Sequence, residues 1–136
     1  MEAAGWFDND PVGQAEFGGF YGMHPRWWDL TRSDPLREGF IAVDPVSDEL
    51  VGFLDTEQDS NGRLDIGMYV RCRHRRLGWG TSIVLAAICW AKAQDMHQVS
   101  AAVRPDNIAS LSCCTAAGLQ PSHVNSYGET VLTLDL

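Results

Sequence analysis

The segment VRCRHRRLGWGTS, at residues 70–82, combines residue types that could bind an anion. Two glycines, Gly78 and Gly80, and the hydroxyl of Thr81 stand where a helix is predicted to begin. The first N–H groups of a helix have no acceptor within it and carry partial positive charge, and glycine lets a ligand approach the backbone closely. The segment therefore predicts a site for phosphate or pyrophosphate. It also holds four of the ten basic residues of a chain whose net charge is −8: Arg71, Arg73, Arg75 and Arg76.

Two familiar phosphate-binding motifs do not fit this segment. No Lys follows Gly80, as a P-loop requires, and Ile83 stands where G-x-G-x-x-G has its third glycine. The arginines could instead contact nucleic acid, but most of the remaining charge is acidic and no separate basic stripe supports such binding. We therefore expect a small anionic ligand and no nucleic acid.

The hydrophobic pattern predicts that this segment connects a strand to a helix. Residues 63–70 alternate as a strand does, and residues 81–93 have helical spacing behind a cap at Thr81 or Ser82. Further strands are predicted at residues 39–44, 50–57, 97–103 and 129–136, and a second helix at 107–117 that ends at Gly118. This order of elements indicates an α/β (α+β) domain with a mixed sheet and helices packed on it.

Two motifs occur in this framework at a characteristic distance. The first is R-x-x-G-x-G, formed by Arg75, Gly78 and Gly80. The second, NIASLSCCTAAGL at residues 107–119, resembles N-x-x-[SA]-x-x-x-Y-x-x-x-G-F, except that Cys114 replaces the tyrosine and leucine replaces the final aromatic residue. Together they resemble the GNAT superfamily of acyl-CoA-dependent N-acetyltransferases. The resemblance covers residues 39–136 and implies a mostly antiparallel central sheet with helices on both faces.

The resemblance implies acetyl-CoA as cosubstrate, which agrees with the anionic ligand expected from the residues themselves. The backbone of residues 75–80, with Thr81, would hold the pyrophosphate, and the other arginines of the segment would be surface charges that assist. The pantetheine arm would lie in a gap between the strands at 63–70 and 97–103. The cofactor-binding residues implied in this way are Met68, Val70, Arg75, Arg76, Gly78, Trp79, Gly80, Thr81, Asn107 and Ser110.

The implied reaction is direct attack of a deprotonated amine on the thioester, with backbone N–H groups polarising the carbonyl. Cys114 stands where relatives often have the tyrosine that protonates the leaving thiolate. It is either a general acid or a buried side chain that fills a small gap, and we favour the second interpretation. Asp65 or Glu57 could take the proton from the amine, directly or through water, although Asp65 could also be simply solvated. His74 and Tyr69 are weaker candidates.

The first part of the chain suggests the kind of acceptor. Residues 1–62 hold 13 acidic and 3 basic side chains, which favours a cationic partner. Residues 1–38 diverge from the family, and we interpret them as an abbreviated acceptor-side segment that a partner subunit could complete. We expect a primary amine of a small cationic molecule; the alternatives are a protein N-terminus or lysine side chain, or a CoA-binding module with little turnover. Aromatic residues of this segment, for the core or the acceptor pocket, are Trp6, Phe7, Phe17, Phe20, Tyr21, Trp27 and Trp28.

Length and composition set the remaining expectations. The 136 residues fit one domain, 1–136, with an acyl-CoA-binding core at 39–136. The four cysteines form no C-x-x-C pair, so we expect reduced thiols and no metal site. The uncharged apolar run at 83–91 is too short to span a bilayer, and the acidic N-terminus lacks the features of a signal peptide. We expect a cytoplasmic protein with no membrane partner, for which a homodimer stays open.

Overall fold

The computed structural model describes residues 33–136, and the aromatic residues up to Trp28 that we considered for the acceptor pocket lie outside this range. Within it, the strands form one six-stranded sheet in the order β1-β2-β3-β4-β6-β5. Neighbouring strands are antiparallel except β3 and β4, which are parallel. The expected mixed, mostly antiparallel sheet is therefore confirmed. The elements are β1 (Arg37–Val43), β2 (Leu50–Gln58), β3 (Arg63–Val70), the short 3₁₀ helix η3 (Cys72–His74), α3 (Trp79–Ala93), β4 (Gln98–Val103), α4 (Ile108–Ala116), β5 (Gln120–Val124) and β6 (Thr130–Asp135).

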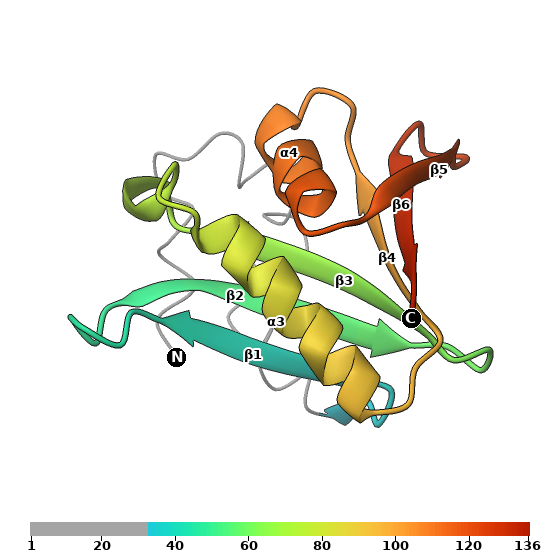
Figure 1. Ribbon diagram of the computed structural model, residues 1–136, viewed down its shortest axis with the longest axis horizontal. Helices are drawn as coiled ribbons and strands as arrows, with labels where there is room; N and C mark the ends of the chain where they lie inside the picture. The colour runs from blue at the N-terminus through green and yellow to red at the C-terminus, as the bar shows by residue number, and fades with distance from the viewer. Residues whose placement is uncertain (1–32) are drawn as a thin grey trace.

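Helix α3 crosses one face of the sheet, and α4 lies beside the N-terminal end of α3 (Figure 1). The alternation of β3 directs Leu64 and Ile66 to this face, where they share a core with Val84 and Ala87 of α3. Cys114 of α4 belongs to the same core. Both described helices therefore cover the same face, and the expectation of helices on the second face concerns residues outside 33–136.

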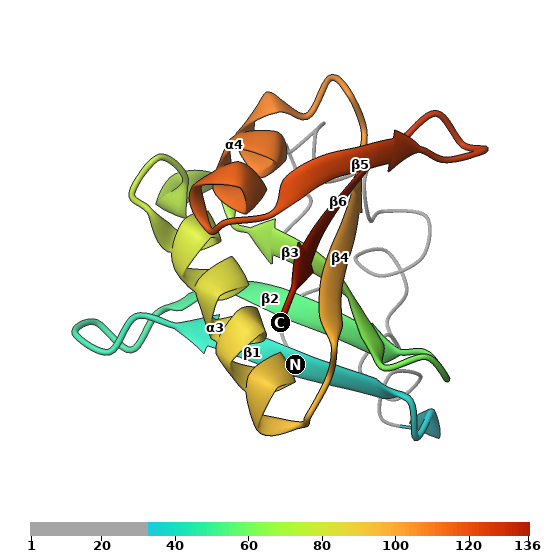
Figure 2. The same cartoon turned by 45° about the vertical axis from the view of Figure 1, so that its right-hand side comes forward.

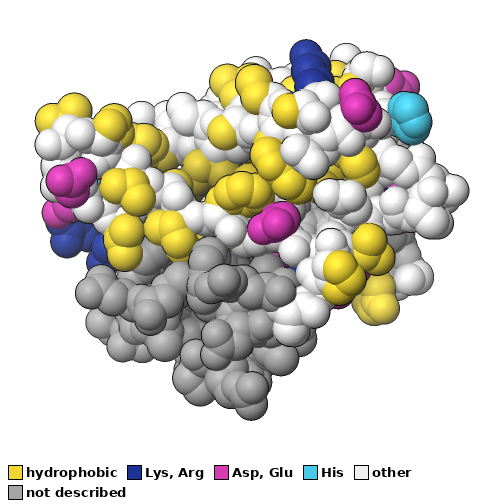
Figure 3. All heavy atoms as spheres, turned by 90° about the horizontal axis from the view of Figure 1, so that it is seen from below, with side chains coloured by type: hydrophobic (Ala, Val, Ile, Leu, Met, Phe, Trp, Pro, Cys, Tyr) yellow, Lys and Arg dark blue, Asp and Glu magenta, His cyan; other side chains and the backbone are white. Residues whose placement is uncertain are grey.

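Phe40 in β1 and Trp90 in α3 close the core at the edge of the sheet. Their ring centres are 5.3 Å apart and their rings meet edge to face at 68°. Both side chains pack against the buried core. Figure 3 views the molecule from below and shows the hydrophobic side chains that reach the surface there in yellow. The contact fixes the C-terminal half of α3 on the first strand, and the opposite end of the helix then lies near the end of β3.

A gap opens between β3 and β4. The two strands pair only through residues 63–65 of β3 and 98–100 of β4, although each of them continues further. Beyond the pair formed by Asp65 and Ser100 they diverge (Figures 1 and 2). The gap that the family resemblance implies is thus confirmed, and it faces the N-terminal ends of α3 and α4.

Strand β5 is the one strand of residues 33–136 that the sequence pattern does not predict. All five of its residues are exposed, and Pro121 lies next to an irregularity in its pairing with β6. Because β5 is the edge strand, it buries no face and shows no apolar alternation, and proline is tolerated there. The turn after it is held by Asn125, whose Oδ1 accepts the N–H groups of Tyr127 and Glu129 at 3.0 Å.

The start of α3 differs from the prediction. The helix begins at Trp79 directly after Gly78, so the expected cap at Thr81 or Ser82 is wrong. Gly78 adopts a φ of +87°, a left-handed conformation that glycine reaches without strain, and no side chain caps the helix. The N-terminus of α3 is consequently left to backbone N–H groups.

The end of α4 agrees with the prediction. Gly118 has a φ of +110°, and its N–H donates to the carbonyl of Thr115 at 3.0 Å. The N–H of Leu119 donates to the carbonyl of Cys114 at 3.0 Å, which completes a Schellman motif. Leu119 is fully buried, so this turn also returns the chain to the core.

Three further observations apply to residues 33–136. None of their helices has the length and hydropathy needed to cross a membrane. These residues include no group of three or more His, Cys, Asp or Glu side chains that could bind a metal ion. The four cysteines, all of which lie in this range, are not paired in disulfides.

Candidate functional site

A cavity of about 670 Å³ lies where the end of β3, the loop before α3 and the start of α4 meet. Its lining includes all ten residues that the sequence analysis associated with the cofactor: Met68, Val70, Arg75, Arg76, Gly78, Trp79, Gly80, Thr81, Asn107 and Ser110. Residues from two separate motifs are therefore brought to one concave surface. The remaining lining residues, which the sequence analysis did not assign to the cofactor, are Tyr69, His74, Asp106, Ile108, Ala109 and Cys113.

The start of α3 presents backbone N–H groups to this cavity. The first intrahelical bond runs from the N–H of Ser82 to the carbonyl of Gly78 at 3.1 Å, so the N–H groups of residues 79–81 have no acceptor inside the helix. A Cβ added at Gly78 would meet no atom within 4 Å, which means that the backbone there borders open space. This arrangement can accept an anion at the positive end of the helix dipole.

The second glycine of the motif serves packing. A Cβ added at Gly80 would lie 2.6 Å from Sγ of Cys113 and 3.4 Å from Cε of Met68. Gly80 is itself buried, and it allows α3 to contact α4 directly. The expectation that both glycines mainly open the backbone to an anion therefore holds for the space at Gly78, whereas at Gly80 the contact with Cys113 dominates.

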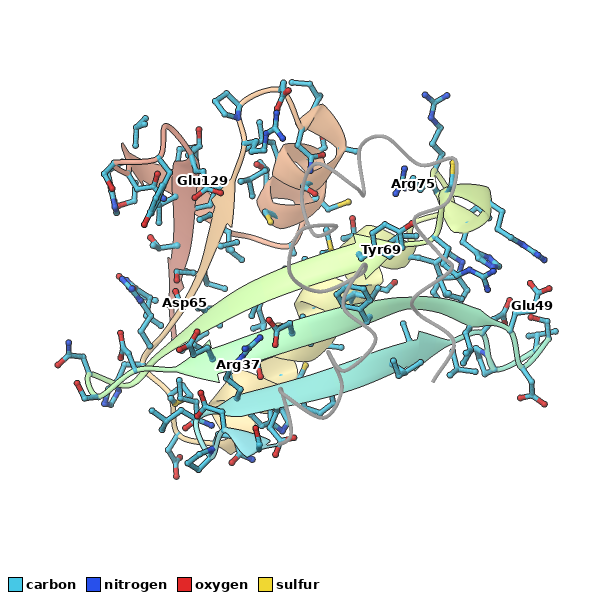
Figure 4. All side chains as sticks on the ribbon, turned by 180° about the vertical axis from the view of Figure 1, so that it is seen from behind. Arg37, Glu49, Asp65, Tyr69, Arg75 and Glu129 are labelled. Carbon is cyan, nitrogen blue, oxygen red and sulfur yellow. The ribbon has the colours of Figure 1, made fainter. Side chains whose placement is uncertain are left out.

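The arginines of the segment point in different directions. Nε of Arg75 donates to the carbonyl of Val70 at 2.9 Å, and its guanidinium lies 5.4 Å from the ring centre of Tyr69 (Figure 4). Arg71 and Arg73 do not line the cavity. The side chain of Arg71 donates to the carbonyl of Leu50 at the start of β2, and that of Arg73 to the carboxylate of Glu49 in the turn before it. Arg76 is exposed and lines the cavity. Of the three assisting charges expected, Arg76 alone borders the cavity.

Asn107 lies between β4 and α4, and the two halves of its side-chain amide have different roles. Its Oδ1 accepts the N–H of Ser110 at 3.3 Å, so the carbonyl half of the amide caps α4. The NH₂ half remains as a donor on a side chain that lines the cavity. The site can therefore offer an amide donor to a carbonyl group of a ligand.

A second, smaller cavity of about 130 Å³ adjoins the first in the gap between β3 and β4. Met68, Asn107 and Ser110 line both cavities. The smaller one continues between Ile66 of β3 and Ala101 of β4. Together the two cavities provide a path from the start of α3 into the gap.

Cys114 lines the smaller cavity, and only 2% of its surface is exposed. Burial, together with the neighbouring Cys113 thiol, raises the pKa of Cys114 to about 11. A thiol with this pKa is neutral at physiological pH. Transfer of its proton to an ordinary thiolate would be unfavourable, because the corresponding thiol has a pKa of about 8.5. The environment of Cys114 therefore favours the packing interpretation over the general acid.

The two candidate carboxylates lie side by side at the other end of β3. Asp65 and Glu57 are cross-strand neighbours, and neither lines either cavity. Asp65 accepts a hydrogen bond from the hydroxyl of Ser100, and Nε of Arg63 is 3.3 Å away. Because the Asp65–Ser100 pair is the last before the strands diverge, Asp65 sits at the closed end of the gap, whereas Glu57 is exposed beyond it.

Two side chains of the site give no clear signal in the sequence. Ser100 is 2% exposed within a strand of small apolar residues, and the only hint is one hydroxyl among them. Cys113 contacts Gly80 across 33 positions of sequence, and local patterns do not report such contacts.

The two weaker candidates for the base, His74 and Tyr69, lie at the C-terminal end of β3. His74 is buried, and Tyr69 stacks on Phe53 with ring centres 5.5 Å apart. Both line the larger cavity, whereas Asp65 and Glu57 lie toward the other end of the strand. The structure therefore separates the two pairs of candidates along β3.

Comparisons with known proteins agree with the fold. The sequence profile of the acetyltransferase (GNAT) family matches residues 9–119. Among solved structures, a GNAT-family acetyltransferase from Bacillus anthracis superposes with a TM-score of 0.81 at 14% identity, covering 98% of this chain and 87% of that one. An aminoglycoside acetyltransferase in complex with coenzyme A gives 0.79 at 13% identity, with 97% and 86% covered. A ribosomal-protein-S5-alanine acetyltransferase from Vibrio fischeri gives 0.75 at 17% identity, with 98% and 85% covered. No curated protein sequence matches the chain.

Proposed function

Because the chain belongs to the acetyltransferase (GNAT) family, we propose that it transfers an acetyl group from acetyl-CoA to a primary amine of a small cationic molecule. The observation that carries the proposal is the cavity at the start of α3, which gathers both motifs on one surface. Residues 1–136 would act as one domain, with residues 39–136 binding acyl-CoA and residues 1–38 on the acceptor side.

The chemistry of the cavity suits the cosubstrate from one end to the other. The N–H groups of residues 79–81 and the open backbone at Gly78 would hold the pyrophosphate, and Arg76 would contribute charge. The amide NH₂ of Asn107 would donate to a carbonyl of the pantetheine arm. The main chain of Met68 and Val70 would pair with the same arm, although the carbonyl of Val70 already accepts from Arg75. The smaller cavity would receive the thioester end.

The transfer itself needs a neutral amine and a polarised thioester. The amine nitrogen forms a bond to the acyl carbon, the carbon–sulfur bond breaks, and the amine's proton leaves to water or a carboxylate while the CoA thiolate departs. Asp65 is the better placed carboxylate, because it lies at the closed end of the gap and is partly exposed to water. Glu57 remains the alternative. We assign Cys114 no role as the acid, because burial raises the pKa of its thiol to about 11 and the thiol therefore holds its proton rather than giving it to the departing thiolate.

The negative charge of the first half of the chain favours a cationic acceptor. The 13 acidic residues against 3 basic ones in residues 1–62 would attract a cation. The fold neighbours act on an aminoglycoside in one case and on a ribosomal protein in another, so the fold itself is compatible with both acceptor classes. A CoA-binding module with little turnover is the second candidate, because Cys114 with its raised pKa stands at the position of the usual acid.

The test mixes the protein with acetyl-CoA and a panel of amines, and follows free thiol with a chromogenic disulfide. The panel contains a polyamine, an aminoglycoside, an amino acid amide and a lysine-containing peptide. Thiol release that depends on a small cationic amine supports the proposal. Release with the peptide alone would move the acceptor to proteins. Tight CoA binding without release for any amine would favour the binding module.

A further inference from the structure

We propose that Glu49, in the turn between β1 and β2, is a positioning residue that holds the pyrophosphate-binding loop in place for the cofactor. This inference rests on the proposed function. Glu49 lies outside both motifs and does not line the cavity. Figure 4 shows it at the same end of the sheet as Arg75, which begins the loop.

The carboxylate of Glu49 reaches two successive side chains of η3. Oε1 is 2.6 Å from a terminal nitrogen of Arg73, and Oε2 is 3.6 Å from Nε2 of His74. His74 is the last residue before the motif and lines the cavity. Only 9% of its side chain is exposed, so its ring has little freedom. Glu49 therefore faces the loop at the point where it enters the site.

The backbone around Glu49 fixes the carboxylate and adds two more bonds to the same loop. The carbonyl of Glu49 accepts the N–H of Asp44 at 2.9 Å, which closes the turn. Next to it, the carbonyl of Leu50 accepts a terminal nitrogen of Arg71 at 2.9 Å, and the carbonyl of Val51 accepts the N–H of Arg71 at 2.8 Å. Hydrogen bonds from the start of β2 thus hold the beginning of the loop at Arg71, and Glu49 adds an ion pair at Arg73.

The charges explain why a carboxylate is placed there. Residues 71–76 carry four arginines, whose mutual repulsion would favour a looser loop. Glu49 offsets part of that charge at Arg73 and leaves Arg76, which borders the cavity, for the ligand. A loop held in its binding conformation before the ligand arrives loses less entropy on binding. Loss of the carboxylate should therefore weaken binding of the pyrophosphate without removing any group that touches it.

The experiment compares Glu49→Gln with Asp48→Asn, and measures Kd for CoA and for pantetheine by calorimetry or competition. Asp48 is the adjacent, exposed carboxylate, and its φ of +61° suits asparagine, so the control removes the same charge without strain. We expect Glu49→Gln to weaken CoA binding about three- to tenfold, the range of a partly exposed ion pair supported by a second contact. Pantetheine lacks the pyrophosphate, so its Kd should change less than about twofold in either variant.

A second variant separates positioning from general stability. His74→Gln should also weaken CoA binding, and the double variant should lose less than the sum of the two single changes, because each of them removes the contact between Glu49 and His74. The Tm of each variant is recorded alongside. The inference is overturned if Glu49→Gln binds CoA as the wild type does, or weakens CoA and pantetheine equally. A wild type that fails to bind CoA would overturn the proposed function as well.

Discussion

The two ends of β3 lie beside groups of opposite charge. At its C-terminal end, backbone N–H groups of α3 and the exposed Arg76 make a site for negative charge. At its other end, Asp65 and Glu57 are paired on adjacent strands, beside a gap lined mostly by apolar side chains. Figure 4 shows Asp65 and Tyr69 near these opposite ends. In the proposed function, binding thus relies mainly on the backbone of one contiguous loop, whereas proton transfer would rely on side chains from neighbouring strands.

The largest effect is expected at the binding end, for Gly78→Glu. The new side chain would project into open cavity and place a carboxylate where the pyrophosphate is proposed to bind, in a left-handed conformation. Because like charges in contact cost several kcal/mol, CoA affinity should fall about a hundredfold or more. Calorimetric titration with CoA measures the loss.

Gly128→Glu is the matched control for this change. Gly128 also has a positive φ, +78°, and a Cβ added there would meet no atom within 4 Å, but it lies in the turn between β5 and β6. The backbone strain of the two variants is therefore comparable, and the control should bind CoA as the wild type does. If Gly78→Glu kept its affinity within a few-fold, the proposed position of the pyrophosphate would be wrong.

The next effect is expected at the opposite end, for Asp65→Asn. If Asp65 takes the proton of the amine, kcat with the preferred amine should fall about a hundredfold, while Kd for acetyl-CoA stays within twofold. Glu57→Gln, at the cross-strand neighbour, serves as the control and should change kcat less than about twofold. A larger loss in Glu57→Gln would exchange the two roles, and no loss in either would leave proton transfer to water or to the weaker candidates His74 and Tyr69.

The same contrast explains what could be predicted from the sequence. Strand alternation and turns are local, so most of the element order could be predicted from them. The gap and ten of the residues that line the larger cavity could be predicted from the motifs and their resemblance. Strand β5 could not, because an exposed edge strand with Pro121 has no apolar pattern. The roles of Gly80 and Ser100 depend on partners from distant elements, Cys113 and Asp65, and a pattern within one segment cannot reveal such contacts.

A smaller effect is expected at Asn107, which lies between the two ends. Asn107→Asp keeps an oxygen that caps α4 and removes the NH₂ donor, so CoA affinity should fall about tenfold with little change in Tm. Asn107→Ala removes both functions and should also lower the free energy of unfolding by about 1 kcal/mol. Calorimetry and thermal melts of both variants measure the two effects. Equal CoA affinity in Asn107→Asp and the wild type would show that the amide donates nothing to the ligand.

The smallest effect on catalysis is expected for Cys114→Ala and Cys114→Ser. The pKa of this thiol is raised from 9.0 to about 11, so it stays neutral between pH 6 and 9 and should contribute no step to a rate profile over that range. Because the unfolded chain ionises first, the free energy of unfolding should fall as the pH rises above about 9, and both variants should lose that dependence. Both should also be less stable at neutral pH, the alanine through a small cavity and the serine through a buried hydroxyl.

For kcat, we expect a loss of only a few-fold in either Cys114 variant, because a side chain that fills the core affects the reaction through packing alone. Steady-state rates at saturating acetyl-CoA, measured from pH 6 to pH 9 against the wild type, test this. A loss beyond about a hundredfold, the range of a general acid, would contradict the packing role. It would also mean that proton transfer extends to the thiolate side of the gap, so that Asp65 and Cys114 would work as a base and an acid on opposite sides of the thioester.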